Sequence, residues 1–241
     1  MTVRALVRWV GLGALLMTGS AGAAPHGLAA ESLAAAGATA GVAANTTAGS
    51  VAVGRPAPTP PAGEFPDAAL ARSEQGDTTI LRVDGIITAG VEQRFAETLR
   101  GLPSGRPLVV ELSSPGGFTS AGYRMIDAIL AERQAGRAVA TRVRGGEACE
   151  SMCVGLYLAG YPRYAAPTAE FMVHAPRMAE NGRMTMRSTQ AMVQRLVALG
   201  ASPVWIERVA AAGGFSGALD YREKADRLTA DGANIVTELI R

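Results

Sequence analysis

Hydrophobic residues in the later two thirds of the chain form short apolar runs that alternate with segments of helical periodicity. The runs, which are rich in β-branched residues, occupy residues 78–83, 107–112, 138–143 and 169–173. Helices are predicted at about residues 91–99, 119–133, 188–199 and 203–212, and one more begins at Ser151. Strands that alternate with helices predict an α/β domain, with a parallel sheet that is covered on its faces.

Two polar segments interrupt this alternation. Residues 177–187 predict a loop, and a polar stretch near the C-terminus contains Asp220 and Asp226. We expect residues 228–230 to open a last short helix or strand that ends at Ile240. In sheets of this class, functional groups collect beyond the carboxyl ends of the strands, so the residues that follow each run are the first candidates for a site.

Residues 1–24 have the pattern of a secretory signal peptide. Arg4 and Arg8 precede an apolar run over residues 9–17, and the small residues that follow predict cleavage after Ala23. The run is short for a bilayer span, which takes about 20 apolar residues. An uncleaved N-terminal membrane anchor is the alternative. Export predicts a periplasmic or secreted protein.

Residues 25–76 predict a disordered linker. They are mostly Ala, Gly, Thr, Pro and Ser, with a proline-dense run at residues 56–61. Such a tract buries too little apolar surface to offset its chain entropy. The folded domain is therefore expected over residues 77–241, a usual size for a single domain.

Charge and rare residues narrow the chemistry. The 23 basic and 21 acidic residues nearly balance, and no basic block with interleaved aromatic residues suggests a nucleic-acid partner. The single lysine is Lys224, and of the two histidines His26 falls in the linker. Chemistry that needs an imidazole in the folded domain therefore has one candidate, His174.

Ser151 lies where a tight turn after a strand leads into an apolar helix. A serine at a helix N-terminus feels the positive end of the helix dipole and lies beside unpaired backbone N–H groups, which suits a nucleophile that must hold an oxyanion. The structural alternative is an ordinary N-cap whose side chain only satisfies the helix.

The ends of successive strands carry the other parts of a serine hydrolase. A nucleophilic serine needs a base, a group that orients the base, and donors aimed at the oxyanion. The candidates are Ser151 as nucleophile, His174 as base, Asp226 as orienting acid with Asp220 in reserve, and Gly116, Gly117 and the Met152 N–H as the oxyanion hole. Glycine suits such a turn because no Cβ obstructs the substrate. The alternatives are a plain turn, a core histidine and solvated surface carboxylates.

Cys149 and Cys153 flank Ser151, and export would place them in an oxidising compartment. They could pack on one helix face, form a disulfide, or bind a metal together with His174. Packing or a disulfide is favoured over metal, so no metal or other cofactor is predicted. A cysteine nucleophile in place of Ser151 is a further alternative.

The order of these motifs resembles the Clp-protease/crotonase superfamily, and most of all an exported, stand-alone branch of the Clp protease proteolytic subunits. The matching residues are Ser114-Pro115-Gly116-Gly117, residues 146–152, Met172-Val173-His174-Ala175-Pro176 and Leu228-Thr229-Ala230. The resemblance covers about residues 78–241. It implies a parallel-sheet fold of ββα repeats, a Ser-His-Asp triad, and a ring-forming homo-oligomer with residues 188–212 as assembly helices.

Three positions qualify the resemblance. The acid of the family usually lies where this chain has Ala225, so Asp226 is offset by one residue. Glu150 takes the place of the small residue that usually precedes the serine. A lysine base would have to be Lys224, which lies far along the chain in a polar stretch.

The sequence therefore predicts a serine hydrolase, a peptidase that cleaves short or unfolded polypeptides through an acyl-enzyme. One alternative is a catalytically silent binding or scaffold module with the same fold. The other is a crotonase-like enzyme that acts on acyl thioesters.

Overall fold

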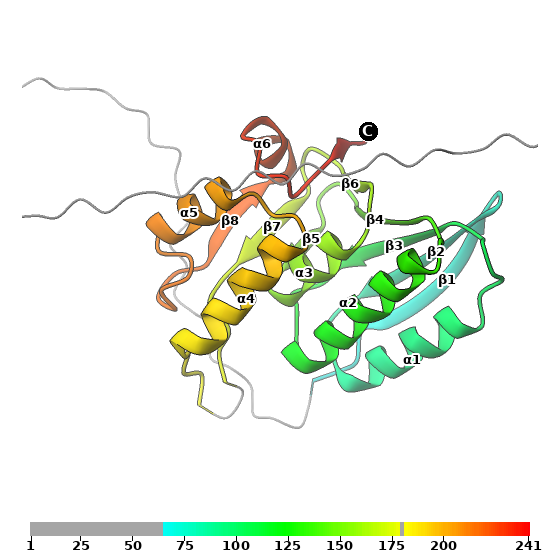
Figure 1. The fold of residues 1–241 in the computed structure, drawn as a ribbon, viewed down its shortest axis with the longest axis horizontal. Coiled ribbons are helices and arrows are strands. Elements are labelled where there is room, and N and C mark those ends of the chain that lie inside the picture. The colour runs from blue at the N-terminus through cyan, green and yellow to red at the C-terminus, as the bar shows by residue number, and fades with distance from the viewer. Residues whose placement is uncertain (1–64, 179–180) are drawn as a thin grey trace, which may run out of the picture. The chain divides into compact units, whose positions relative to one another are not determined.

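The computed structural model describes residues 65–178 and 181–241, and its main sheet has six strands in the order β1-β2-β3-β4-β6-β9 (Figure 1). These strands are β1 (Ala69–Gln75), β2 (Thr78–Asp84), β3 (Leu108–Ser113), β4 (Val139–Val143), β6 (Arg163–Ala165) and β9 (Glu238–Leu239). From β2 to β9 each pair of neighbours is parallel, and β1 is antiparallel to β2. The predicted α/β class with a parallel sheet is confirmed.

Strand β1 corrects the predicted end of the linker. Residues 69–75 were expected to be disordered, but they pair with β2 along its whole length through a turn at Gly76, whose φ is 61°. The strand is mostly exposed, and its backbone hydrogen bonds need no apolar side chains, so its composition did not reveal it. Residues 1–64 lie outside the described residues, so the signal peptide and the rest of the linker remain predictions.

Three helices pack against the main sheet and one another: α1 (Ala89–Arg100), α2 (Thr119–Gln134) and α3 (Met152–Ala159). Thr88 caps α1, where its hydroxyl accepts a hydrogen bond from the Val91 N–H. Each of α1 and α2 buries one apolar stripe, as the periodicity predicted. Residues 153–159 of α3 are all buried, because this helix lies inside the domain rather than on its surface.

A second, three-stranded sheet has the order β5-β7-β8, with strands β5 (Ala148–Glu150), β7 (Glu170–Val173) and β8 (Tyr221–Lys224). β5 and β7 are parallel, and β8 is antiparallel to β7. Of these three strands only β7 was predicted, because β5 is three residues long and β8 lies in the polar stretch. The prediction also missed β6 of the main sheet, which is equally short. Ser151 and His174 follow β5 and β7 directly, so both residues lie at the same edge of this sheet.

The remaining helices are α4 (Met186–Ala198), α5 (Pro203–Ala211) and α6 (Ala225–Ala230). The predictions for α4 and α5 are confirmed within two residues. Residues 228–230 close α6 instead of opening a new unit, and the last strand is the short β9. In the part of the chain that the structure describes, no helix is both long and apolar enough to cross a membrane.

Candidate active site

Ser151 occupies a sharp turn between β5 and α3. Its φ is 54° and its ψ is −119°, in a region that non-glycine residues rarely adopt, at a cost of about 1–2 kcal/mol. Its N–H donates to the Met172 carbonyl oxygen at 2.7 Å. Its side chain makes no capping hydrogen bond, so the N-cap alternative is wrong. The hydroxyl group is instead left free to face the cavity, which Ser151 lines.

The glycine turn lies directly against Ser151. A Cβ built on Gly116, whose φ is 92°, would lie 2.8 Å from Ser151 Cβ and 3.0 Å from Met152 N. Side chains tolerate no such approach, so a glycine is required here for the turn and the serine to meet. The predicted oxyanion-hole residues Gly116 and Met152 are thus neighbours in space.

The Gly117 N–H points away from Ile87, its bridge partner. Gly117 bridges Ile87 in the parallel sense: the Ile87 N–H donates to Gly116 and the Phe118 N–H donates to Ile87, at 2.8 Å each. In such a bridge the N–H of the central residue points the other way. Gly117 lines the cavity, and neither its N–H nor that of Met152 donates to another group among the described residues.

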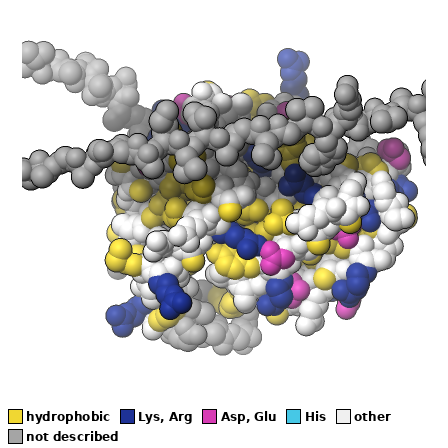
Figure 2. All heavy atoms as spheres, viewed as in Figure 1, with side chains coloured by type: hydrophobic (Ala, Val, Ile, Leu, Met, Phe, Trp, Pro, Cys, Tyr) yellow, Lys and Arg dark blue, Asp and Glu magenta, His cyan; other side chains and the backbone are white. Residues whose placement is uncertain are grey.

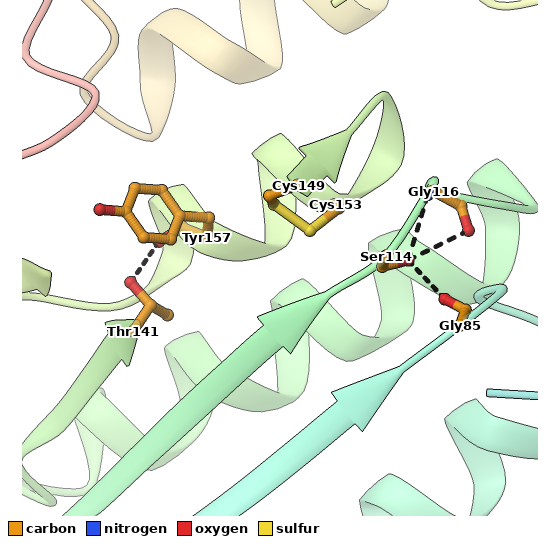
Figure 3. The surroundings of a disulfide bond; sticks show 7 residues. All are labelled: Gly85, Ser114, Gly116, Thr141, Cys149, Cys153 and Tyr157. Atoms are coloured by element: carbon orange, nitrogen blue, oxygen red, sulfur yellow. Dashed lines mark hydrogen bonds between the residues drawn. A yellow bond between two sulfur atoms is a disulfide. The ribbon is translucent and has the colours of Figure 1, made fainter. Parts of the chain in front are cut away.

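Ser114 fixes this turn in place. Its hydroxyl donates to the Gly85 carbonyl oxygen at 2.6 Å and accepts from the Gly116 N–H at 3.1 Å (Figure 3). Its backbone pairs with β5: the Ser114 N–H donates to Ala148, and the Glu150 N–H donates to Ser114, both at 2.9 Å. The turn and the segment before Ser151 are therefore one hydrogen-bonded unit.

His174 is half-buried at the end of β7 and lines the same cavity. Its Nδ1 lies 2.7 Å from the Ala175 carbonyl oxygen, which can only accept, so the proton belongs on Nδ1. Nε2 is then the atom able to take a proton from a hydroxyl. Burial lowers the pKa of His174, and Arg177 lowers it further, while the Ala175 hydrogen bond, Asp220 and Glu150 act in the opposite direction.

The structure does not bring Asp226 to His174. Asp226 is exposed at the start of α6, its carboxylate accepts a hydrogen bond from the Arg227 N–H at 2.8 Å, and it does not line the cavity. Its neighbour Ala225 is the residue that faces the core. Asp220 pairs with Arg177 at 3.1 Å and is the aspartate that acts on the His174 charge. A backbone carbonyl, rather than the predicted carboxylate, orients the imidazole.

The cavity beside Ser151 has a volume of about 210 Å³. Much of its wall is apolar and comes from α2, α3 and α4, including Ile126, Met152 and Leu196. Arg195 also lines it; its guanidinium lies 5.1 Å from the centre of the Tyr123 ring and pairs with Asp127. Figure 2 shows the face on which α2 and α4 lie, where hydrophobic side chains lie next to basic and acidic ones. Sequence reasoning missed this wall, because its residues come from three separate helices.

Glu150 does not crowd the serine. Its carboxylate pairs with Arg222 on β8, which also pairs with Glu170 at 2.8 Å. Glu150 is absent from the cavity wall, and so is Lys224, which lies on β8 and cannot serve as a lysine base from there. The unusual residue before Ser151 therefore leaves the approach to the hydroxyl open.

Cys149 and Cys153 form a disulfide, with their Cα atoms 5.2 Å apart. Of the alternatives for this pair, the disulfide is the one that the structure contains. Because each sulfur is bonded to the other, neither cysteine serves here as a nucleophile or as a metal ligand. Within residues 65–178 and 181–241, no group of three or more His, Cys, Asp or Glu residues could hold a metal ion.

The chain matches the model of a known protein family. The model of the Clp protease family matches residues 77–199, about half of the chain. The match includes Ser151 and His174 and ends before Asp220 and Asp226. No curated protein is significantly similar to the chain in sequence.

Proposed function

The chain belongs to the Clp protease family, and we propose on that basis that it is a serine peptidase with Ser151 as nucleophile and His174 as general base. One observation carries the proposal. Ser151 is held at a strained φ, its hydroxyl makes no capping hydrogen bond, and the N–H groups of Gly117 and Met152 beside it have no partner among the described residues. Strain and unused donors persist in proteins chiefly where they serve function.

The proposed reaction uses these groups in sequence. The Ser151 Oγ attacks the peptide carbonyl carbon while His174 Nε2 accepts the hydroxyl proton. The carbonyl oxygen becomes an oxyanion that accepts hydrogen bonds from the Gly117 and Met152 N–H groups. His174 then returns the proton to the leaving amine, which breaks the C–N bond and leaves an acyl-serine. A water molecule, deprotonated by the same imidazole, hydrolyses this ester.

The surroundings of His174 suit a base without a carboxylate partner. The Ala175 carbonyl holds the Nδ1 proton, so Nε2 points its lone pair outward. Because the pKa of His174 lies below its ordinary value of 6.5, the imidazole is neutral at physiological pH. The Asp220 carboxylate, which acts on the imidazole through space, stabilises the cation that forms during the reaction.

The substrates that fit best are short or already unfolded polypeptides. The predicted signal peptide would deliver the protein to the periplasm or the cell exterior, where no ATP-driven unfoldase is expected. The Cys149–Cys153 disulfide supports an oxidising compartment. Because much of the cavity wall is apolar, we expect the substrate to carry an apolar side chain next to the cleaved bond.

Assembly into a homo-oligomer belongs to the same proposal. In α4 and α5, which cover most of the predicted assembly segment 188–212, several apolar side chains are exposed, among them Met186 and Val204 at 85% and 71%. Exposed apolar side chains mark an interface between subunits where they form a contiguous patch. Light scattering of the purified protein would measure the number of subunits, and a monomer would contradict this part.

The proposal is tested by labelling the purified protein with a fluorophosphonate and mapping the adduct by mass spectrometry. We expect an adduct on Ser151 that is absent in Ser151→Ala and at least about 100-fold slower in His174→Ala. Asp226→Asn should label like the wild type, because Asp226 does not reach the cavity. Absence of an adduct, where a control serine hydrolase reacts, would favour the silent scaffold. Hydrolysis of acyl thioesters but not of peptides would favour the crotonase-like enzyme.

A pair of glycine variants tests the oxyanion hole separately. Gly116 and Gly136 have φ values of 92° and 89°, but a Cβ on Gly136 would meet no atom within 4 Å. Both alanine variants should lose about 1 kcal/mol of stability from the strained φ. Gly116→Ala should lose more than this, because its Cβ also meets Ser151 and the backbone around it. Only Gly116→Ala should also slow labelling, by about 100-fold, because its Cβ displaces Ser151 and the Met152 N–H. Equal labelling rates in the two variants would contradict the assigned hole.

A further inference from the structure

The Cys149–Cys153 disulfide encloses the nucleophile. Cys149 is the central residue of β5, Cys153 is the second residue of α3, and Ser151 lies midway between them. Both cysteine side chains are fully buried. Figure 3 shows the bond lying beside Ser114, the residue that fixes the glycine turn. The bond therefore joins the segment before the serine to the helix after it.

One end of this link is held firmly. Cys149 bridges Ser114 on one side and is the register partner of Phe171 in β7 on the other. Hydrogen bonds of 2.9 Å from the Ser114 and Glu150 N–H groups flank the bridge. Cys149 is thus fixed relative both to the glycine turn and to the strand that carries His174.

The other end lacks the usual supports. α3 has no side-chain N-cap, because the Ser151 hydroxyl makes no capping hydrogen bond. The Met152 N–H, one of the proposed oxyanion donors, has no partner among the described residues. Ser151 itself is strained. Besides the packing of its buried side chains, the first turn of α3 is held by the hydrogen bonds from Ser151 to Met172 and from Val154 to Ser151, and by the bond to Cys149.

We propose that the Cys149–Cys153 disulfide is a positioning element of the active site. It constrains the start of α3, which has no side-chain N-cap, and so keeps the Met152 and Gly117 N–H groups at a fixed distance from Ser151. This inference rests on the proposed peptidase function. It makes catalysis dependent on the oxidised form, so the enzyme becomes active only after export and oxidation. The cysteines act through Met152 and Ser151 and do not touch the substrate.

Reduction would undo this arrangement. A dithiol reductant gives two electrons and two protons, the S–S bond breaks, two thiols form, and the reductant becomes a cyclic disulfide. The two unbonded sulfur atoms need van der Waals separation inside a closely packed core, so β5 and the first turn of α3 must move apart. A displacement of about 1 Å between reacting groups can lower a rate about 100-fold.

The test compares the wild type with Cys149→Ala/Cys153→Ala and with the matched core variant Val209→Ala. Val209 is fully buried on α5 and does not line the cavity, so its loss lowers stability without touching the site. We expect the double variant to fold but to label with fluorophosphonate about 100-fold more slowly, with the fall in kcat and little change in KM. Val209→Ala should label at the wild-type rate. A double variant that labels like the wild type would overturn the proposal.

Two further measurements cover the remaining outcomes. If the double variant does not fold, the wild type is reduced with dithiothreitol and its thiols are counted by alkylation. The labelling rate should then fall on reduction and return on reoxidation. Unchanged labelling of the dithiol form refutes the proposal. If the wild type itself does not label, the peptidase function fails. Amide exchange at Glu150 and Ser151 then decides the positioning role, which requires faster exchange without the disulfide and is refuted by equal exchange.

Discussion

At the scale of single residues, His174 shows how an imidazole can be oriented without a bonded carboxylate. Its Nδ1 proton is held by the carbonyl of the next residue, and its burial suppresses the charged form. The nearest aspartate influence comes from Asp220, which is itself paired with Arg177. Charges around the ring therefore tune its pKa without orienting it.

This arrangement predicts the acid limb of the pH–rate profile. The base is active when neutral, so activity falls as the pH drops through its pKa. Because that pKa is lowered from 6.5, the midpoint of the acid limb of kcat/KM should lie below pH 6.5. Asp220 raises the pKa, so Asp220→Asn should move the midpoint to still lower pH. The exposed Asp226→Asn is the control and should leave it unchanged. A wild-type midpoint at or above pH 6.5 would contradict this account.

Residue patterns alone singled out Ser151, His174 and the glycine turn as site candidates, and the structure brings Ser151, His174 and Gly117 to one cavity. The ends of adjacent strands meet in space, so local sequence signals became a site. The acid was different. Asp226 lies in a stretch without periodicity, and nothing local showed that Ala225 faces the core while Asp226 faces solvent. The disulfide was one of several alternatives, since spacing alone did not decide its chemistry.

At the scale of secondary-structure elements, long periodic segments were predicted well and short polar strands were not. β2, β3 and β4 are apolar runs, but β8 has the sequence YREK and only Glu223 among its residues is buried. Such a strand forms because β7 offers it hydrogen bonds, and that information lies elsewhere in the chain. The same dependence on partners applies to charged residues that face one another across the main sheet.

One cross-strand row in this sheet is expected to contribute to stability in acid. Arg82, Glu111 and Arg142 are register partners in β2, β3 and β4, and Glu111 is fully buried. Hydrogen bonds of 3.0 Å from Arg82 and 2.7 Å from Arg142, with Arg144 at 2.6 Å, surround its carboxylate. Burial raises the pKa of Glu111, but these arginines outweigh burial and lower it below its usual 4.5.

The sign of the effect follows from that lowered pKa. The ionised Glu111 carboxylate contributes its full stabilisation above the unfolded-state pKa, and this stabilisation is lost as the pH falls through the folded-state pKa. Glu111→Gln should cost about 2 kcal/mol at pH 7, because the buried side chain loses its charged hydrogen bonds to arginines that are themselves partly exposed, and should weaken the acid dependence. Urea unfolding measured from pH 7 to pH 3 checks this.

Glu92→Gln, which removes a half-exposed pair with Arg124, is the control and should change stability by less than about 1 kcal/mol. Glu111→Gln with wild-type stability at pH 7 would refute the role of the row.

At the scale of the whole molecule, the residues beyond the family match complete the fold. The hydrophobic core includes residues from beyond residues 77–199, among them Trp205, Val209, Leu228 and Ile235. Strand β8 also pairs with β7, the strand that carries His174. The C-terminal part thus supports the site even though it supplies no residue that the proposed reaction uses directly.

Arg163 is the residue that holds the C-terminal tail to this core. It is 4% exposed, and its guanidinium donates to the carbonyl oxygens of Ile235 and Asn234 at 2.7 Å each. Its own backbone N–H donates to the Thr237 hydroxyl at 2.8 Å.

Arg163→Met would leave two tail carbonyls without their donor, so we expect a loss of about 3 kcal/mol in urea unfolding. Arg227→Met, at an exposed arginine of α6, should change stability by no more than about 0.5 kcal/mol. Because Arg163 does not line the cavity, folded Arg163→Met should label at Ser151 at the wild-type rate. A stable variant would show that the tail is held without the guanidinium, and a folded variant that labels slowly would show that the tail acts on the site.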